Sequence, residues 1–317
     1  MPAARDTATV VHAARLYYEQ GRSQSEIATV LGLSRSNVSR ILTQARERGI
    51  VEIIIHDPEG PPLRDEALEH VLRSTFRLRD VHVVHTPRAD GLDAVARAGA
   101  ALLAQLAPSA HSIGVSWGHT VQSVVEHLEP LRLRPAPRVL PLVGGLSALD
   151  EYESGESVLR VLAARLGARG EMLYAPALLE SATAVRTLRA ESSIARVLEV
   201  AAAVELALVG IGSMGHHSSP HLVRMMRLRP EEEQAFQAQN PVGDVCGRFV
   251  NAGGIPLGAP TDDRVLGVTF SELLRIGHVI GVAAGAEKAP GVRGVLRSGA
   301  IDTLVIDLEL ARALLAT

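Results

Sequence analysis

The segment Ser116–Thr120, SWGHT, joins groups that bind phosphate at the start of a predicted helix. Gly118 lets a ligand approach the backbone, and His119 and Thr120 begin the helix, whose first N–H groups and dipole attract an anion. The hydroxyls of Ser116 and Thr120 add two donors. The residue types therefore predict a phosphate-binding turn.

Three further segments follow β-branched runs and have similar chemistry. Glycine pairs or glycine-hydroxyl runs permit close backbone approach, and the sole lysine of the chain can neutralise a phosphate. Their candidate residues are Gly144 and Gly145, then Gly210, Gly212 and Ser213, and finally Lys288. Each segment alone usually only turns the chain, but together at one edge of a sheet they predict an anion pocket.

The size of the expected ligand follows from two missing motifs. The chain has no GxGxxG at its first strand–helix turn and no GxxxxGK[ST], so a phosphate ester smaller than a dinucleotide or nucleoside triphosphate is expected. No cofactor is predicted. Cys246, the single cysteine, has no zinc-ligand set or nucleophile motif around it and is expected to be a buried core residue.

A second group of polar residues, near the N-terminus, is of the kind that contacts DNA. Arginine can grip guanine, and asparagine or glutamine can pair with adenine in the major groove. The candidate contacts are Ser34, Arg35, Ser36, Asn37, Ser39, Arg40 and Gln44. Double-stranded DNA is therefore a predicted partner.

These residues need a helix-turn-helix to present them. Apolar spacing predicts helices over 7–19 and 24–31 and a third from a Ser34 cap towards Arg48. Ser23 with Glu26 forms a capping box, and Gly32 supplies the turn. The alternative is an ordinary three-helix bundle without nucleic acid. The run 51–55, VEIII, predicts a short strand, either closing the domain or forming a wing.

Composition and charge divide the chain in the same place. Seven arginines against four acids leave +3 in residues 1–50, and since the whole chain carries −3, the remainder carries −6. The prolines and glycine of DPEGPP cannot continue a helix. We expect a DNA-binding domain over 1–56, a linker over 57–64 and an effector-binding domain over 65–317.

No apolar run is long enough to span a bilayer and no leader is evident, so a cytoplasmic protein without membrane contact is expected.

Beyond residue 65, β-branched runs alternate with helical stretches, which predicts a Rossmann-like parallel α/β sheet with crossover helices. The expected strands are 81–84, 112–115, 139–142, 206–211, 265–268, 279–283 and 303–306. The expected helices are 93–106, 120–128, 157–166, 192–202, 292–297 and 308–315.

The chain resembles the SorC/DeoR family of sugar-responsive regulators across nearly its whole length. The resemblance rests on SQSEIATVLGLSRSNVSRIL, RGIVEIII, GVSWGHT, LPLVGGL, ALVGIGS, VGDVCGRF and HVIGVAAGAEKAPGVRGVLRSGAIDTLVID. It implies a DNA-binding head on a sensor whose fold is related to sugar-phosphate isomerases and deaminases. It also implies a phosphorylated-sugar effector, a homodimer or homotetramer, and a place for Asp244 in the effector site.

Two positions depart from the family pattern, and both concern the ligand. His119 stands where relatives often have arginine or threonine, and Val143 is apolar where some relatives are charged. The number of phosphates on the effector is therefore left open.

Ligand-controlled repression at an inverted-repeat operator, bound by a symmetric dimer, is the expected mechanism, although activation is an alternative.

Two other readings compete. A sugar-phosphate isomerase or deaminase with an accessory head would need a positioned base, for which Asp244, Asp262, Asp263 and His119 are candidates. Metal-dependent regulation is suggested by His216, His217 and His221, but adjacent histidines in a proline-bounded loop point in different directions. We predict neither catalysis nor a metal site, and a lid over the sugar site is an equal alternative for the histidines.

Overall fold

The computed structural model describes residues 7–51, 63–85, 91–146, 155–215 and 218–316. The chain divides into two compact units, Met1–Pro58 and Glu59–Thr317, which we call the head and the body. The predicted strand 51–55 and linker 57–64 lie largely outside the described residues. None of the described helices is both long and apolar enough to cross a bilayer.

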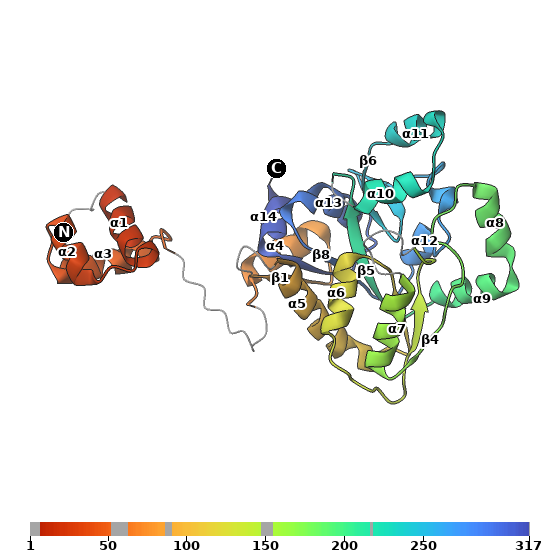
Figure 1. The fold of residues 1–317 in the computed structure, drawn as a ribbon, viewed down its shortest axis with the longest axis horizontal. Helices are drawn as coiled ribbons and strands as arrows, with labels where there is room; N and C mark the ends of the chain where they lie inside the picture. Colours follow the sequence, from red (N-terminus) through yellow and green to blue (C-terminus); the bar gives the residue numbers. More distant parts are fainter. Residues whose placement is uncertain (1–6, 52–62, 86–90, 147–154, 216–217, 317) are drawn as a thin grey trace. The chain divides into compact units, whose positions relative to one another are not determined.

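The head is the predicted helix-turn-helix (Figure 1). Helix α1 (Thr7–Ala14) continues as a π-helical turn (Arg15–Glu19) and is followed by α2 (Gln24–Leu31) and α3 (Arg35–Glu47). The expected capping box of Ser23 and Glu26 is present, and Gly32 ends α2 in the left-handed conformation. Apolar residues of all three helices share one core, as the sequence periodicity predicts.

The body contains a seven-stranded parallel sheet, which confirms the predicted fold class. Its strand order is β1-β9-β8-β5-β2-β3-β4. A hairpin of β6 and β7 is attached by antiparallel pairing of β6 to the end of β5. The strands are β1 (Asp80–Val84), β2 (Ser112–Val115), β3 (Arg138–Pro141), β4 (Arg169–Gly170), β5 (Leu206–Ser213), β6 (Pro241–Val245), β7 (Arg248–Asn251), β8 (Val279–Ala283) and β9 (Thr303–Asp307).

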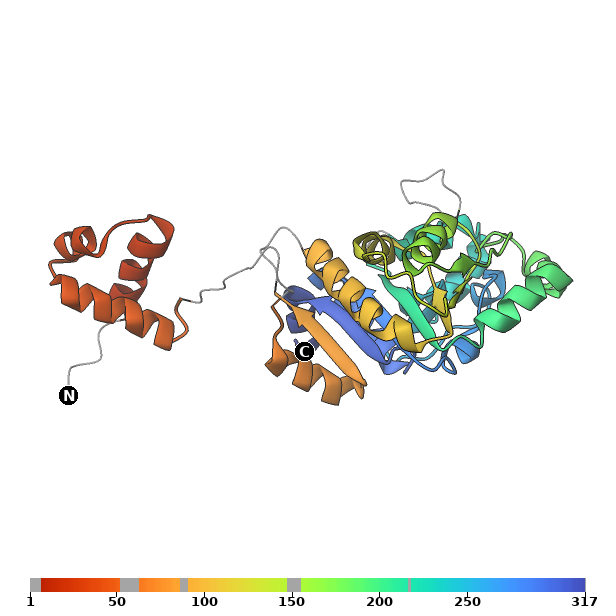
Figure 2. The same ribbon diagram turned by 90° about the horizontal axis from the view of Figure 1, so that it is seen from below.

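Helices cover both faces of the sheet, so the body has three layers (Figures 1 and 2). One face packs against α5 (Gly91–Leu106), α6 (His119–His127) and α7 (Gly155–Leu166). The other packs against α4 (Glu66–Phe76), α13 (Ala289–Arg297) and α14 (Leu308–Leu315). The remaining helices are α8 (Ala182–Ala190), α9 (Ser192–Ala201), α10 (Ser218–Met225), α11 (Pro230–Gln237) and α12 (Phe270–Leu273).

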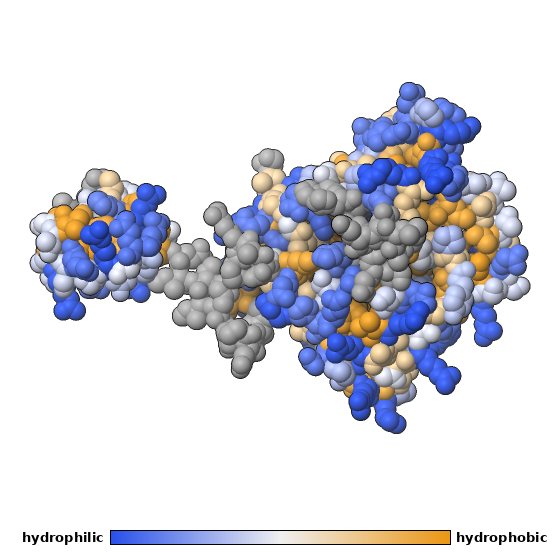
Figure 3. Space-filling model, in the orientation of Figure 1, coloured by the Kyte–Doolittle hydropathy of each residue, from blue (hydrophilic) through white to orange (hydrophobic). Residues whose placement is uncertain are grey.

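A separate apolar cluster joins residues that follow the carboxyl ends of the strands to the α10–α11 region. Trp117 and Val143 belong to it together with Phe236 of α11 and Phe249 of β7. The two phenylalanine rings meet edge to face at 5.0 Å. Figure 3 shows that the outer surface around α11 is largely hydrophilic. This cluster anchors the α10–α11 region to the carboxyl edge of the sheet, where ligands bind in such folds.

Two sequence predictions about strands are wrong. Residues 265–268 do not form a strand, because Val265 and Gly267 each make only an isolated bridge, to Leu178 and Val143 respectively. Residues 265–268 are apolar because they are buried on several sides, not because they pair within a β-sheet. The strand predicted over 206–211 ends too early: Gly212 and Ser213 extend β5 past the parallel sheet, where Gly212 pairs with Asp244 of β6.

Several elements were not predicted: α4, α8, α10, α11, α12, the short strand β4 and the β6–β7 hairpin. The hairpin contains Cys246, which is buried as expected, and burial raises the pKa of its thiol to about 12.

Candidate functional site

The parallel strands bring most of the predicted anion-binding residues to one edge of the sheet. β2, β3, β5 and β8 are mutually parallel neighbours, so the residues after their carboxyl ends gather there. Two of these segments are in direct contact, because the Gly210 N–H of β5 donates to Ser116 Oγ, after β2, at 3.2 Å. Gly212, two residues further along β5, pairs with Asp244.

The turn from β2 into α6 has the geometry of an anion site. Gly118 is the N-cap at φ 131° and ψ 150°, a conformation essentially restricted to glycine. A Cβ built on Gly118 would meet nothing within 4 Å, so the space in front of it is open. Ser116 and Thr120 are buried, whereas His119 is exposed. The first N–H groups of α6 have no partner within the helix and can bind an anion.

Asp244 is held by protein donors on both carboxylate oxygens. Ser219 Oγ donates to Oδ1 at 2.5 Å, and the Gly247 N–H donates to Oδ2 at 3.2 Å. Burial raises the pKa of Asp244, an effect opposed by these two hydrogen bonds and by the charge of Lys288. Gly212 is required here, because a Cβ would lie 2.1 Å from Asp244 Oδ1. Ser219 is therefore a positioning residue that the sequence analysis missed, having treated its segment only as a histidine loop.

Lys288 lies immediately before α13 and is partly buried. Burial lowers its pKa, while the charges of Glu287, Asp307 and Asp244 raise it. Ser213 is 1% exposed, and its Oγ has no hydrogen-bond partner among the described residues. A Cβ on Gly291, in the first turn of α13, would lie 2.7 Å from Ser213 Cβ, so Ser213 lies against the start of that helix.

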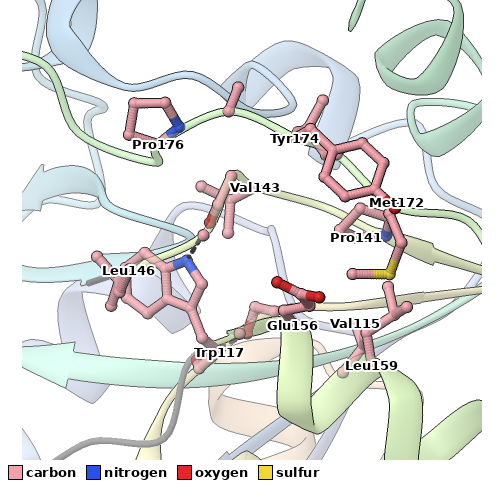
Figure 4. Close-up of a pocket in the computed structure, with 16 residues that line it drawn as sticks. Val115, Trp117, Pro141, Val143, Leu146, Glu156, Leu159, Met172, Tyr174 and Pro176 are labelled. Atoms are coloured by element: carbon pink, nitrogen blue, oxygen red, sulfur yellow. Dashed lines mark hydrogen bonds between the residues drawn. The ribbon is translucent and has the colours of Figure 1, made fainter. Parts of the chain in front are cut away.

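A cavity of about 300 Å³ opens beside these residues (Figure 4). Ser116, Gly144 and Gly145 line it, whereas the other predicted effector residues do not: Gly118, His119, Thr120, Gly210, Gly212, Ser213, Asp244 and Lys288. Gly144 is needed for packing, because its Cβ would lie 2.6 Å from the Ala175 carbonyl oxygen.

The rest of the cavity wall was not predicted. Trp117, Glu156, Met172 and Tyr174 line it. Trp117 directly follows Ser116, and that adjacency was its one sequence signal. The other three come from segments far along the chain, and nothing in their local sequence marks them as lining residues.

The head presents the predicted DNA-contacting face on α3. Val38, Ile41, Leu42 and Ala45 bury the inner side of the helix. The opposite side exposes Arg35, Ser36, Ser39 and Arg40, while Asn37 and Gln44 are partly buried. Ser34 is exposed and caps the helix, its Oγ accepting from the Asn37 N–H at 3.3 Å.

The candidate catalytic and metal-binding residues have other surroundings. Asp262 pairs with Arg248 at 2.7 Å, and Asp263 and His119 are exposed. Among the residues that the structure describes, no three His, Cys, Asp or Glu side chains form a metal site. His216 and His217 lie outside the described residues, and His221 is partly buried on α10.

Two family models match the two units. Residues 61–316 match the model described as a putative sugar-binding domain, and residues 14–48 match region 4 of Sigma-70. The second match covers the π-helical turn, α2 and α3 of the head, but only the last residue of α1.

Similar proteins share both units. The chain is 31% identical to the sorbitol operon regulator of Klebsiella pneumoniae, over 98% of each chain. It is 30% identical to the deoxyribonucleoside regulator of Bacillus subtilis, over 96% of each chain. The crystal structure of the full-length sorbitol operon regulator SorC from K. pneumoniae superposes with a TM-score of 0.72 at 30% identity, covering 98% of this chain and 99% of that one.

Proposed function

The chain belongs to the SorC/DeoR family of sugar-binding transcriptional regulators, and from that premise we propose that a phosphorylated sugar bound by the body sets the affinity of the head for an operator. The arrangement that carries this proposal is at the carboxyl edge. There the first turn of α6 packs against β5 at Gly210 and Lys288 lies close enough to Asp244 to feel its charge, with a cavity alongside.

The phosphate is assigned to the turn that opens α6 and to Lys288. Gly118, His119 and Thr120 offer backbone N–H groups and the Thr120 hydroxyl, and the Lys288 ammonium supplies a charge. Ser116 supports the turn, because its N–H donates to the Leu208 carbonyl at 3.0 Å and its hydroxyl to the Trp117 carbonyl at 3.2 Å. Gly210, Gly212 and Ser213 of β5, with Asp244, support this side of the site. The hydroxyls of the sugar would face Asp244 and the glycine pair Gly144 and Gly145.

The operator is assigned to α3 of the head. Arg35 and Arg40 are exposed and can contact bases or phosphates, and Asn37 and Gln44 can pair with adenine. We infer a homodimer or homotetramer acting on an inverted repeat, with half-sites one helical turn or a multiple apart, roughly 10 bp per turn. Repression relieved by the sugar is the expected direction. The ligand can change operator affinity only by binding one arrangement of the subunits better than another.

Lys288 gives the direct test of the effector site. Lys288→Ala should leave operator affinity without ligand unchanged and abolish the response to a sugar phosphate, since the ammonium is removed. Lys288→Arg is the matched control, because it keeps the positive charge. Operator binding is measured by fluorescence anisotropy with and without each candidate sugar phosphate. A Lys288→Ala protein that responds like the wild type would refute the assignment.

The enzyme alternative predicts a different outcome with the same reagents. An isomerase or deaminase would convert a candidate sugar phosphate to product, with Asp244, Asp262, Asp263 or His119 as the base. Incubation of the purified protein with the panel, followed by mass and NMR analysis of the sugars, distinguishes the two. Measurable turnover would overturn our assignment of a sensing role.

A further inference from the structure

The cavity beside the phosphate-binding residues has an unusual charge distribution for a site that binds a sugar phosphate. Of the described residues that line it, Glu156 is the only charged one. Val143, which also lines it, is apolar and 3% exposed. A second phosphate group therefore finds no described cation in this wall.

Glu156 lies where an anion would otherwise be favoured. It is in the first turn of α7, and the start of a helix attracts negative charge. The side chain reaches into the space between Trp117 and Met172 (Figure 4). Arg160, one turn along α7, pairs with Glu156. The carboxylate thus lies at the helix terminus and is already paired with a cation of its own helix.

The remaining walls fit a neutral, hydroxylated group. The Trp117 indole N–H donates to the Gly144 carbonyl at 3.0 Å, which fixes the ring. A Cβ on Gly155 would lie 3.0 Å from Trp117 Cδ1, so the start of α7 packs directly against the indole. Tyr174 is 84% exposed, and its ring lies on the far side of the cavity from Trp117 (Figure 4). Aromatic rings pack on the C–H faces of sugars, and a carboxylate accepts hydrogen bonds from their hydroxyls.

We propose that this cavity receives the unphosphorylated end of the effector, and that Glu156 excludes a second phosphate from it. The effector class is then a sugar monophosphate, with its phosphate at the α6 turn and its neutral end between Trp117 and Tyr174. This inference rests on the proposed function and specifies it further, because it fixes the number of phosphates and names the residue that selects for it.

The test compares ligands that differ by one phosphate. Binding of fructose 6-phosphate, glucose 6-phosphate, ribose 5-phosphate and fructose 1,6-bisphosphate to the full chain is measured by isothermal titration calorimetry. At least one monophosphate should bind about tenfold or more tightly than the bisphosphate, since two like charges at contact distance repel strongly in a partly buried site.

Three variants locate the effect. Glu156→Gln keeps the shape and removes the charge, so it should bring the bisphosphate to within about threefold of the monophosphate. Glu156→Arg should reverse the preference. Glu129→Gln, an exposed carboxylate outside the cavity wall, is the matched control and should behave as the wild type.

The possible outcomes separate this inference from the proposed function. Equal or tighter binding of the bisphosphate by the wild type overturns the inference and leaves the proposed function standing. A preference for the monophosphate that persists unchanged in both Glu156 variants also overturns the role of Glu156. If no sugar phosphate of the panel binds, the proposed function fails and the inference fails with it.

Discussion

Asp244 is a buried carboxyl group held in place by the protein, unlike a base that is free to take a proton from a substrate. Its two oxygens accept from Ser219 and from the Gly247 N–H, and the side chain packs against β5 where only glycine fits. Burial raises its pKa. A carboxyl group with a raised pKa is protonated more readily than one in water, and both of its oxygens are held by protein donors.

The raised pKa of Asp244 has a definite consequence for stability. The folded state binds a proton more tightly than the unfolded chain, whose aspartates titrate near about 3.9. The stabilisation is therefore complete below that value and is lost as pH rises through the folded-state pKa. The melting temperature of the wild type minus that of Asp244→Asn should fall as pH rises from about 4 to 7. A difference that grows with pH would mean that the pKa of Asp244 is lowered.

Arg40 is the clearest single-residue test of the DNA-binding face. It is exposed on the side of α3 opposite the buried residues, so its loss should not disturb the core of the head. Arg40→Ala should weaken operator binding by about 1–3 kcal/mol if it contacts a base. Arg196→Ala, an exposed arginine on α9 of the body, is the control and should leave affinity unchanged. Equal affinities for Arg40→Ala and the wild type would remove Arg40 from the interface.

At the scale of elements, periodicity and caps in the sequence predict the helix-turn-helix and most of the parallel sheet. β2, β8 and α14 have the expected limits, because buried β-branched runs and amphipathic helices are local signals. Asp65 caps α4 by accepting from the Leu68 N–H, a signal that the prediction did not use.

The elements that were missed or wrong depend on contacts distant in sequence. Residues 265–268 look like a strand but pair with segments on two sides, held in place by Arg248, whose guanidinium donates to the Val265 and Val268 carbonyls. The same limitation hid Ser219 and Glu156. Each acquires its role from a side chain or wall contributed by another part of the chain, and no local pattern encodes that.

Gly118 tests the turn that positions α6. Its backbone lies in a region that only glycine enters readily, and no atom would clash with a Cβ. Gly118→Ala should therefore lower the free energy of unfolding by about 1–3 kcal/mol through backbone strain alone, and weaken ligand binding. Gly258→Ala, also in open space but without a left-handed φ, is the control in urea denaturation of the full chain. Equal stability of the two variants would contradict this account of the turn.

At the scale of the whole molecule, charge and function divide along the same boundary. The first 50 residues carry +3 and the rest −6, a charge division that favours the proposed placement of the DNA contact in the head. The body and head are separate compact units. The proposed function therefore depends on a coupling between them, and we propose that ligand binding supplies it by altering how subunits assemble.

The most direct test of that coupling is the operator affinity of the full chain with and without its ligand. An operator is first obtained by unbiased oligonucleotide selection, and the ligand by a thermal-shift screen of sugar monophosphates. We predict that fluorescence anisotropy will give dissociation constants for the operator that differ by about tenfold or more between the free and ligand-saturated protein. Identical dissociation constants at a ligand concentration that fully stabilises the body would contradict the account.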